Sequence, residues 1–99
     1  MKQDMDIKAQ VRQILLWVKQ VSPGRAVELR IPPYGAIQCV EGLNHRRGTP
    51  PNVVEISPEV FVSICLGASS WQEEIENGKV LASGELVKEL AALFPLSRD

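Results

Sequence analysis

The sequence predicts an α+β domain in which a mostly antiparallel sheet of four to five strands carries its helices on one face. Two alternating apolar runs flank a Pro-Pro-Tyr-Gly turn at residues 32–35, which indicates a hairpin. One long amphipathic stretch precedes this hairpin, and a third strand follows it, after which come helical patterns and one more short strand. With 99 residues, the chain is expected to form a single domain, 1–99, with a small core.

The first element is predicted to be a helix that begins near Asp6 and ends at Ser22-Pro23-Gly24. Its apolar residues recur with a period of 3.6, which places them on one face. This stripe consists of Ile7, Val11, Ile14, Leu15, Val18 and Val21.

Two strands are expected next, Arg25–Ile31 and Ala36–Glu41, and the short turn between them makes them antiparallel neighbours. In the second strand, alternation puts Gln38 and Val40 on the face opposite Ile37 and Cys39. A loop stiffened by two prolines then leads to a third strand at Val53–Ile56.

The last part of the chain is predicted to hold three helices and a fourth strand. Ser57 and Pro58 start the first helix, and Gly67 ends it. A capping box at Ser70-Trp71-Gln72-Glu73 opens the second, which Asn77-Gly78 closes. The fourth strand is expected at Lys79–Ser83 and the last helix at Glu85–Phe94. Because two helices separate strands three and four, a right-handed crossover within one sheet is possible.

Charge and cysteine content exclude several classes of function. The net charge is −1, and residues 57–99 carry seven acidic and three basic side chains, so we expect no nucleic-acid partner. No apolar run is long enough to span a membrane. Without a secretory signal, Cys39 and Cys65 are expected to be reduced thiols in the cytoplasm. With a single histidine they do not form a standard zinc site, so we expect no metal and no cofactor.

Three groups of residues could carry chemistry, and each also has a purely structural interpretation. The loop from His45 to Thr49 could hold a carboxylate or phosphate through its arginines, or these arginines could be solvated or paired with nearby glutamates. Cys39 could act as a nucleophile with His45, but no residue is placed to orient the histidine, so we expect no enzyme. Phe61 and Trp71 could line an apolar pocket or belong to the core.

The sequence resembles a known family in its C-terminal half and, more specifically, in two of its motifs. A helix from Ser57 to Gly67, a short second helix, the Gly78-Lys79-Val80 strand and a Leu-rich last helix are features of the sterol-carrier (nonspecific lipid-transfer) domain. The segments PPYGAIQC and RGTPPNVVE are similar to those of a group of small bacterial orthologues of this domain. The resemblance implies a sterol-carrier-like fold that encloses an apolar tunnel.

It also implies non-catalytic binding of a lipid or other apolar small molecule, fatty-acyl or sterol-like, in an internal cavity. Arg46 and Arg47 are candidates to meet an acidic head group at the mouth of this cavity. The candidate lining residues are Val27, Leu29, Ile37, Cys39, Phe61, Ile64 and Trp71. An alternative is an accessory or protein-interaction domain without lipid cargo, in which the proline turn and the arginine loop form a contact, for example in a homodimer.

Overall fold

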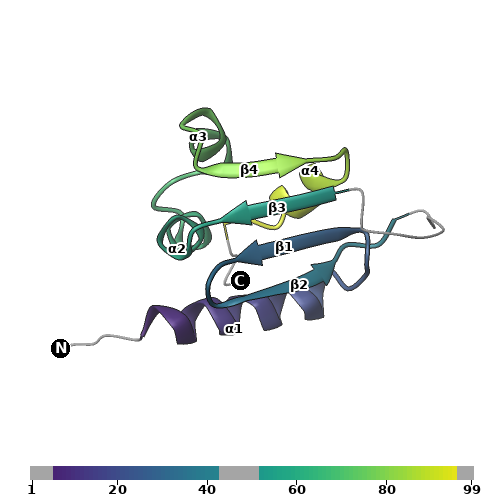
Figure 1. The fold of residues 1–99 in the computed structure, drawn as a ribbon, viewed down its shortest axis with the longest axis horizontal. Coiled ribbons are helices and arrows are strands. Elements are labelled where there is room, and N and C mark those ends of the chain that lie inside the picture. Colours follow the sequence, from purple (N-terminus) through teal and green to yellow (C-terminus); the bar gives the residue numbers. More distant parts are fainter. Residues whose placement is uncertain (1–5, 43–51, 96–99) are drawn as a thin grey trace.

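A computed structural model describes residues 6–42 and 52–95 and confirms the α+β class, with four helices and one four-stranded sheet in this part of the chain (Figure 1). In chain order the elements are α1 (Ile7–Val21), β1 (Val27–Ile31), β2 (Gly35–Cys39), β3 (Asn52–Ile56), α2 (Pro58–Leu66), α3 (Trp71–Glu76), β4 (Val80–Ser83) and α4 (Val87–Ala91). The helices α1 and α4 lie behind the sheet in Figure 1, and no helix crosses the face toward the viewer.

The described sheet has four strands, the lower number expected, and it is mixed: two of its strand pairings are antiparallel, as expected for a mostly antiparallel sheet, and one is parallel. Its order is β2-β1-β3-β4, and β1 and β3 run parallel. The register explains this arrangement, because Val27 at the start of β1 is opposite both Cys39, which ends β2, and Asn52, which begins β3. The chain therefore passes from one side of β1 to the other at a single end of the sheet, and β3 necessarily repeats the direction of β1.

The right-handed crossover that the two intervening helices would permit between the third and fourth strands is not formed. β3 and β4 are adjacent and antiparallel, with Val54 opposite Ala82. Together α2 and α3 reverse the chain at the end of β3, so the handedness rule for parallel strands does not apply to this connection.

The first helix confirms its predicted stripe except at its end. Asp6 accepts a hydrogen bond at Oδ1 from the backbone N–H of Lys8 (3.3 Å), as expected of an N-cap. Val11, Leu15 and Val18 are buried against the sheet. Val21 is exposed, because it occupies the last turn of the helix, where the chain already leaves the core.

Val40 is also placed differently from the prediction, which had it on the outer face of the second strand. It follows β2 with a φ of 68°, is buried, and exchanges backbone hydrogen bonds with Ser22 and Ala26. Gly24, at a φ of 146°, lies directly against the Val40 carbonyl, where a Cβ atom would collide. The alternation ends at Cys39 because the backbone turns left-handed at the next residue.

The local signals in the second half are largely confirmed. Gly67 closes α2 in the left-handed conformation, and Ser70 and Glu73 form the reciprocal capping box of α3. Ser57 takes the N-cap position of α2, although its side chain makes no capping hydrogen bond. The last helix is shorter than predicted, because the backbone N–H of Leu86 is held by a side chain of β3 and the chain becomes helical only after it.

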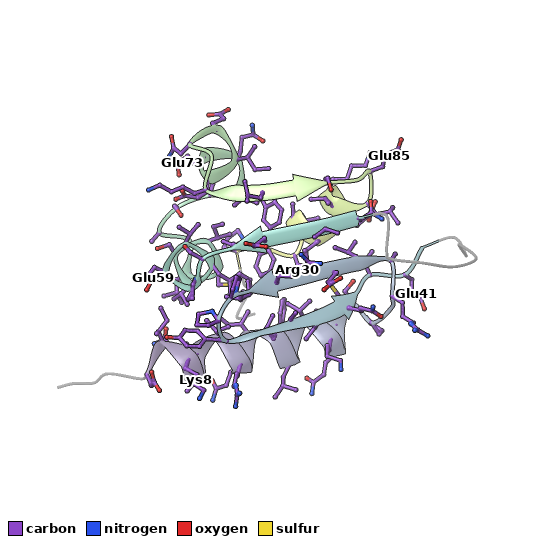
Figure 2. All side chains as sticks on the ribbon, viewed as in Figure 1. Lys8, Arg30, Glu41, Glu59, Glu73 and Glu85 are labelled. Atoms are coloured by element: carbon purple, nitrogen blue, oxygen red, sulfur yellow. The ribbon has the colours of Figure 1, made fainter. Side chains whose placement is uncertain are left out.

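The sheet face toward the viewer carries charge instead of a helix layer. Figure 2 shows Arg30 on this face, where its Nε lies 3.0 Å from Oε2 of Glu28 and its guanidinium reaches Glu55 at 4.0 Å. The opposite face of the same strands buries Leu29 and Val54 in the core. The sheet is thus one wall of a two-layer domain, and its apolar side faces the helices.

Candidate functional site

Most of the candidate lining residues lie in the packed core. Val27, Leu29, Cys39 and Phe61 are at most 1% exposed and belong to one continuous cluster of buried side chains. Ile37 is partly buried and packs against that cluster. The position of these residues in the closed interior accounts for their apolar character without a ligand.

Two candidates, Ile64 and Trp71, line a pocket of about 230 Å³ at the edge of this core. The pocket lies between the end of α2, the start of α3 and the segment that follows α4. Its walls are Ile64, Gly67, Ala68, Ser69, Ser70, Trp71, Glu73, Phe94 and Pro95. Arg46 and Arg47, the candidates for the mouth of a cavity, fall outside the described residues.

Phe94, a residue of the pocket wall, is also the centre of an aromatic cluster. Its ring stacks on Trp71 with the centroids 6.2 Å apart and an interplanar angle of 6°. It meets Phe61 edge-on at 5.9 Å and Trp17 of α1 at 6.5 Å. Such pairs contribute about 0.5–1.5 kcal/mol each beyond the burial of area. The cluster therefore joins α1, α2, α3 and the C-terminal segment.

The backbone between α2 and α3 is fixed by hydrogen bonds at both helix ends. The N–H of Ala68 donates to the carbonyl of Ser63 (2.9 Å), which completes the left-handed cap at Gly67. The hydroxyl of Ser70 accepts from the N–H of Glu73, and the Glu73 carboxylate accepts from the N–H of Ser70, both at 3.0 Å. These hydrogen bonds within the fold thus fix the backbone of the pocket rim.

Three residues of the pocket wall have polar side chains, namely Ser69, Ser70 and Glu73. The hydroxyl oxygen of Ser69 is buried and has no hydrogen-bond partner among the described residues. Glu73 supplies a carboxylate, and Figure 2 shows it on α3, beside the β4 edge of the sheet. An otherwise apolar pocket with few polar groups is typical of small-molecule sites.

The two cysteines are buried in surroundings that suppress their reactivity. Desolvation raises the pKa of Cys39 to about 11 and that of Cys65 to about 12, so both thiols stay protonated at neutral pH. Within residues 6–42 and 52–95, no three His, Cys, Asp or Glu side chains are grouped in a way that could hold a metal ion. In the same ranges no helix is both long and apolar enough to cross a membrane.

Sequence reasoning missed Ser69, Phe94 and Pro95 as parts of the pocket. Ser69 follows a helix-ending glycine and precedes a capping serine, so its position between two helix ends was visible, but the burial of its hydroxyl was not. The sequence predicts Phe94 in the last turn of a helix. In the structure α4 ends at Ala91, and the backbone N–H groups of Leu93 and Phe94 donate to carbonyls three residues earlier, as in tight turns. An aromatic residue directly before a proline at the end of a helix was the available signal.

A comparison with protein families matches residues 3–96 to the family described as "Bacterial SCP ortholog". The match spans nearly the whole chain, including both helix ends that frame the pocket. A comparison with curated proteins finds no match.

Proposed function

This chain belongs to the family of bacterial SCP orthologs, and from that premise we propose that it binds the hydrocarbon chain of a lipid without catalysis. The binding site in this proposal is the pocket between α2, α3 and Phe94. The observation that carries the proposal is a pocket whose wall includes Ile64, Trp71 and Phe94 and that borders an aromatic cluster.

The size of the pocket limits what it can hold. Pockets for drug-sized ligands have volumes of roughly 300–1,000 Å³, and this one, at about 230 Å³, is smaller. It suits the end of a single acyl chain better than a complete sterol. The parallel rings of Trp71 and Phe94 offer flat apolar surface to such a chain.

Binding without covalent chemistry agrees with the character of the nearby nucleophiles. Cys65 is on α2, close in sequence to Ile64 of the pocket wall, but burial keeps its thiol protonated. A protonated, buried thiol is a poor nucleophile. We therefore assign the pocket a carrier role.

The proposal is tested by measuring bound lipid. Purified protein is denatured and extracted, and acyl lipid is quantified by mass spectrometry. Ala68→Leu fills part of the pocket and should lower the amount of bound lipid at least about threefold, because the added methylenes occupy ligand volume. The matched control is Ala36→Leu on the exposed face of β2, which should carry as much lipid as the native protein.

Two outcomes contradict the proposal. One is native protein without extractable lipid that also fails to bind the uncharged dye Nile red. The other is equal lipid content in the Ala68→Leu and Ala36→Leu variants, because the ligand would then lie elsewhere.

An accessory or interaction domain, such as a homodimer, is a second candidate, and one observation favours it. β4 is an edge strand of the sheet, and Leu81 on it is 62% exposed. Exposed edges with apolar side chains pair readily with another chain. Light scattering over a dilution series tests this candidate: a dimer that Leu81→Lys converts to monomer supports it, and a monomer at all concentrations contradicts it.

A further inference from the structure

The two edges of the described sheet lie at margins of opposite charge. In the order β2-β1-β3-β4, the edge strands are β2 and β4. Figure 1 shows α1 beside β2 and α3 beside β4, at opposite ends of this order. Residues 6–42 carry five basic and three acidic side chains, whereas residues 52–95 carry two and seven. The described part of the chain is therefore positive toward β2 and negative toward β4.

The exposed side of α1 carries a basic stripe. Its members follow one face of the helix and are all exposed: Lys8, Arg12, Leu16 and Lys19. The helix itself contains no acidic residue, and Asp6 beside it is engaged as the N-cap. Leu16, in the middle of the stripe, is 61% exposed. The stripe thus offers three cations around one apolar side chain, which suits an acidic surface that also exposes an apolar side chain.

The margin formed by α3 and β4, here called the β4 margin, has this complementary character. Within residues 71–85, one basic side chain, Lys79, stands against four acidic ones: Glu73, Glu74, Glu76 and Glu85. Figure 2 shows Glu73 and Glu85 at the two ends of this margin, on the side of the molecule opposite Lys8. Leu81 of β4 is 62% exposed and Ile75 of α3 is 37% exposed. Charge and exposed apolar area therefore match those of the basic stripe.

The direction of α1 fits a contact between the two margins of different copies. In Figure 1, α1 begins on the side of α3 and ends on the side where β4 ends. A copy that is shifted along the strand order therefore brings Lys8 toward α3 and Lys19 toward Glu85 of its neighbour. A symmetric pairing of two β4 strands would instead bring two acidic margins together, and such like-charge contacts are costly.

We infer that this chain self-associates head to tail, with the basic stripe of one copy against the β4 margin of the next. The contact is heterologous, so each copy uses two different surfaces, and the assembly is a ring or an open row. The inference rests on the second candidate function, self-association. It is independent of lipid binding, because Arg12, Leu16, Glu76 and Glu85 lie outside the described pocket wall.

The test is reversal of charge on each surface in the full-length protein. Lys8→Glu/Arg12→Glu reverses the stripe, and Glu76→Lys/Glu85→Lys reverses the β4 margin. Lys8 lies in the first turn of α1 and Glu76 ends α3, so these new charges suit the helix dipoles and the variants should fold.

Light scattering over a dilution series measures the association. The native protein should associate at about 0.02 M salt and dissociate at about 0.5 M, where charges are screened more strongly. Each reversed protein alone should associate at least about tenfold more weakly than the native protein. The matched control is Glu59→Lys/Glu89→Lys, which has the same net charge as Glu76→Lys/Glu85→Lys but changes α2 and α4, and it should associate as the native protein does.

Mixing the two reversed proteins is the deciding step. In an equimolar mixture, each reversed surface meets a surface of opposite charge on the other protein. Association should therefore return to within about threefold of the native level. A mixture that associates no better than its separate components would overturn the inference.

Three further results also decide against it. If the native protein is a monomer at every concentration in low salt, self-association fails altogether, while lipid binding stands. If Leu81→Lys breaks a native dimer that Lys8→Glu/Arg12→Glu leaves intact, two β4 strands pair and the head-to-tail contact alone is wrong. If the native protein stays a monomer but sediments with phosphatidylglycerol vesicles through the basic stripe, the partner of the stripe is an anionic lipid surface.

Discussion

Asn52 is a buried polar residue that connects three parts of the fold through hydrogen bonds. Its Nδ2 donates to the carbonyl of Ala26 (2.8 Å), and its Oδ1 accepts from the backbone N–H of Leu86 (2.9 Å). One side chain thus satisfies a carbonyl just before β1 and an amide just before α4, both in a buried or half-buried setting. The sequence offered no sign of this role, because asparagine before a strand is commonly a loop residue.

We predict that Asn52→Ala lowers the free energy of unfolding by about 2–4 kcal/mol, because two partners lose their hydrogen bonds inside the protein. Urea denaturation followed by circular dichroism measures this loss. Gln13→Ala, at an exposed position of α1, is the control and should change stability by less than about 0.5 kcal/mol. A loss below 1 kcal/mol for Asn52→Ala would show that water replaces both bonds.

The buried thiols make stability depend on pH in the alkaline range. Burial raises the pKa of Cys39 to about 11 and that of Cys65 to about 12, whereas a thiol in the unfolded chain has a pKa near ~8.5. Their contribution is therefore fully present below about pH 8.5 and is lost as the pH rises toward the folded-state values.

Between pH 9 and about 11, each thiol should lower the free energy of unfolding by up to about 1.4 kcal/mol per pH unit. Urea denaturation across this range measures the slope. A Cys39→Ala/Cys65→Ala variant is less stable at pH 7 but should show a shallower slope. Equal slopes in the two proteins would mean that other groups cause the alkaline loss.

At the scale of elements, α1 illustrates how adjacent leucines differ. Leu15 is 5% exposed and packs into the core, whereas Leu16 is 61% exposed. Helical periodicity was sufficient to predict Leu15 as buried, because position in the turn decides which side chain faces the sheet.

We therefore predict that Leu15→Ala lowers the free energy of unfolding by about 2–4 kcal/mol, through lost burial and the cavity left behind. Leu16→Ala, the matched control one residue away, should change it by less than about 0.5 kcal/mol. Thermal and chemical denaturation of both variants measure the difference. Similar losses would indicate that Leu16 is covered in solution, for instance by a partner.

In the turn between β4 and α4, the backbone of Gly84 lies directly against the side chain of Asn52. Gly84 has a φ of 106°, and a Cβ atom there would collide with the Asn52 side chain. Gly78 also has a positive φ, 76°, but a Cβ atom at its position meets no neighbour within 4 Å. Substituting each glycine therefore distinguishes the cost of a steric collision, present only at Gly84, from the cost of a strained backbone, present at both.

Gly84→Ala should cost more than about 3 kcal/mol, because it adds a collision with Asn52 to the strain of its φ. Gly78→Ala should cost only the strain, about 1 kcal/mol. The comparison is made by chemical denaturation at neutral pH. Equal costs would mean that the turn shifts freely away from Asn52.

Local elements were predictable because their signals are local. The stripe of α1, the glycine that ends α2 and the capping box of α3 each depend on residues within a few positions of one another. The parallel pairing of β1 with β3 was not predictable in this way. It follows from which edge of β1 remains free after β2 has paired, and no short motif encodes that.

For the whole molecule, the small size of the domain determines where a ligand can bind. The apolar residues on the inner face of the sheet, such as Val27 and Leu29, fill the interior of the domain. The described pocket therefore lies at the edge of the core. Sequence reasoning identified Ile64 and Trp71 of this pocket from their apolar character. It did not find Phe94 or Ser69, because their roles arise from three segments meeting in space.

The central claim is that an apolar ligand binds between α2, α3 and Phe94. Amide chemical-shift mapping by NMR during titration with Nile red tests it most directly. We predict the largest shifts at residues 67–71 and at Phe94, with the indole N–H of Trp71 moving more than that of Trp17. Shifts confined to the open face of β1 and β3, or no shifts at saturating dye, would contradict it.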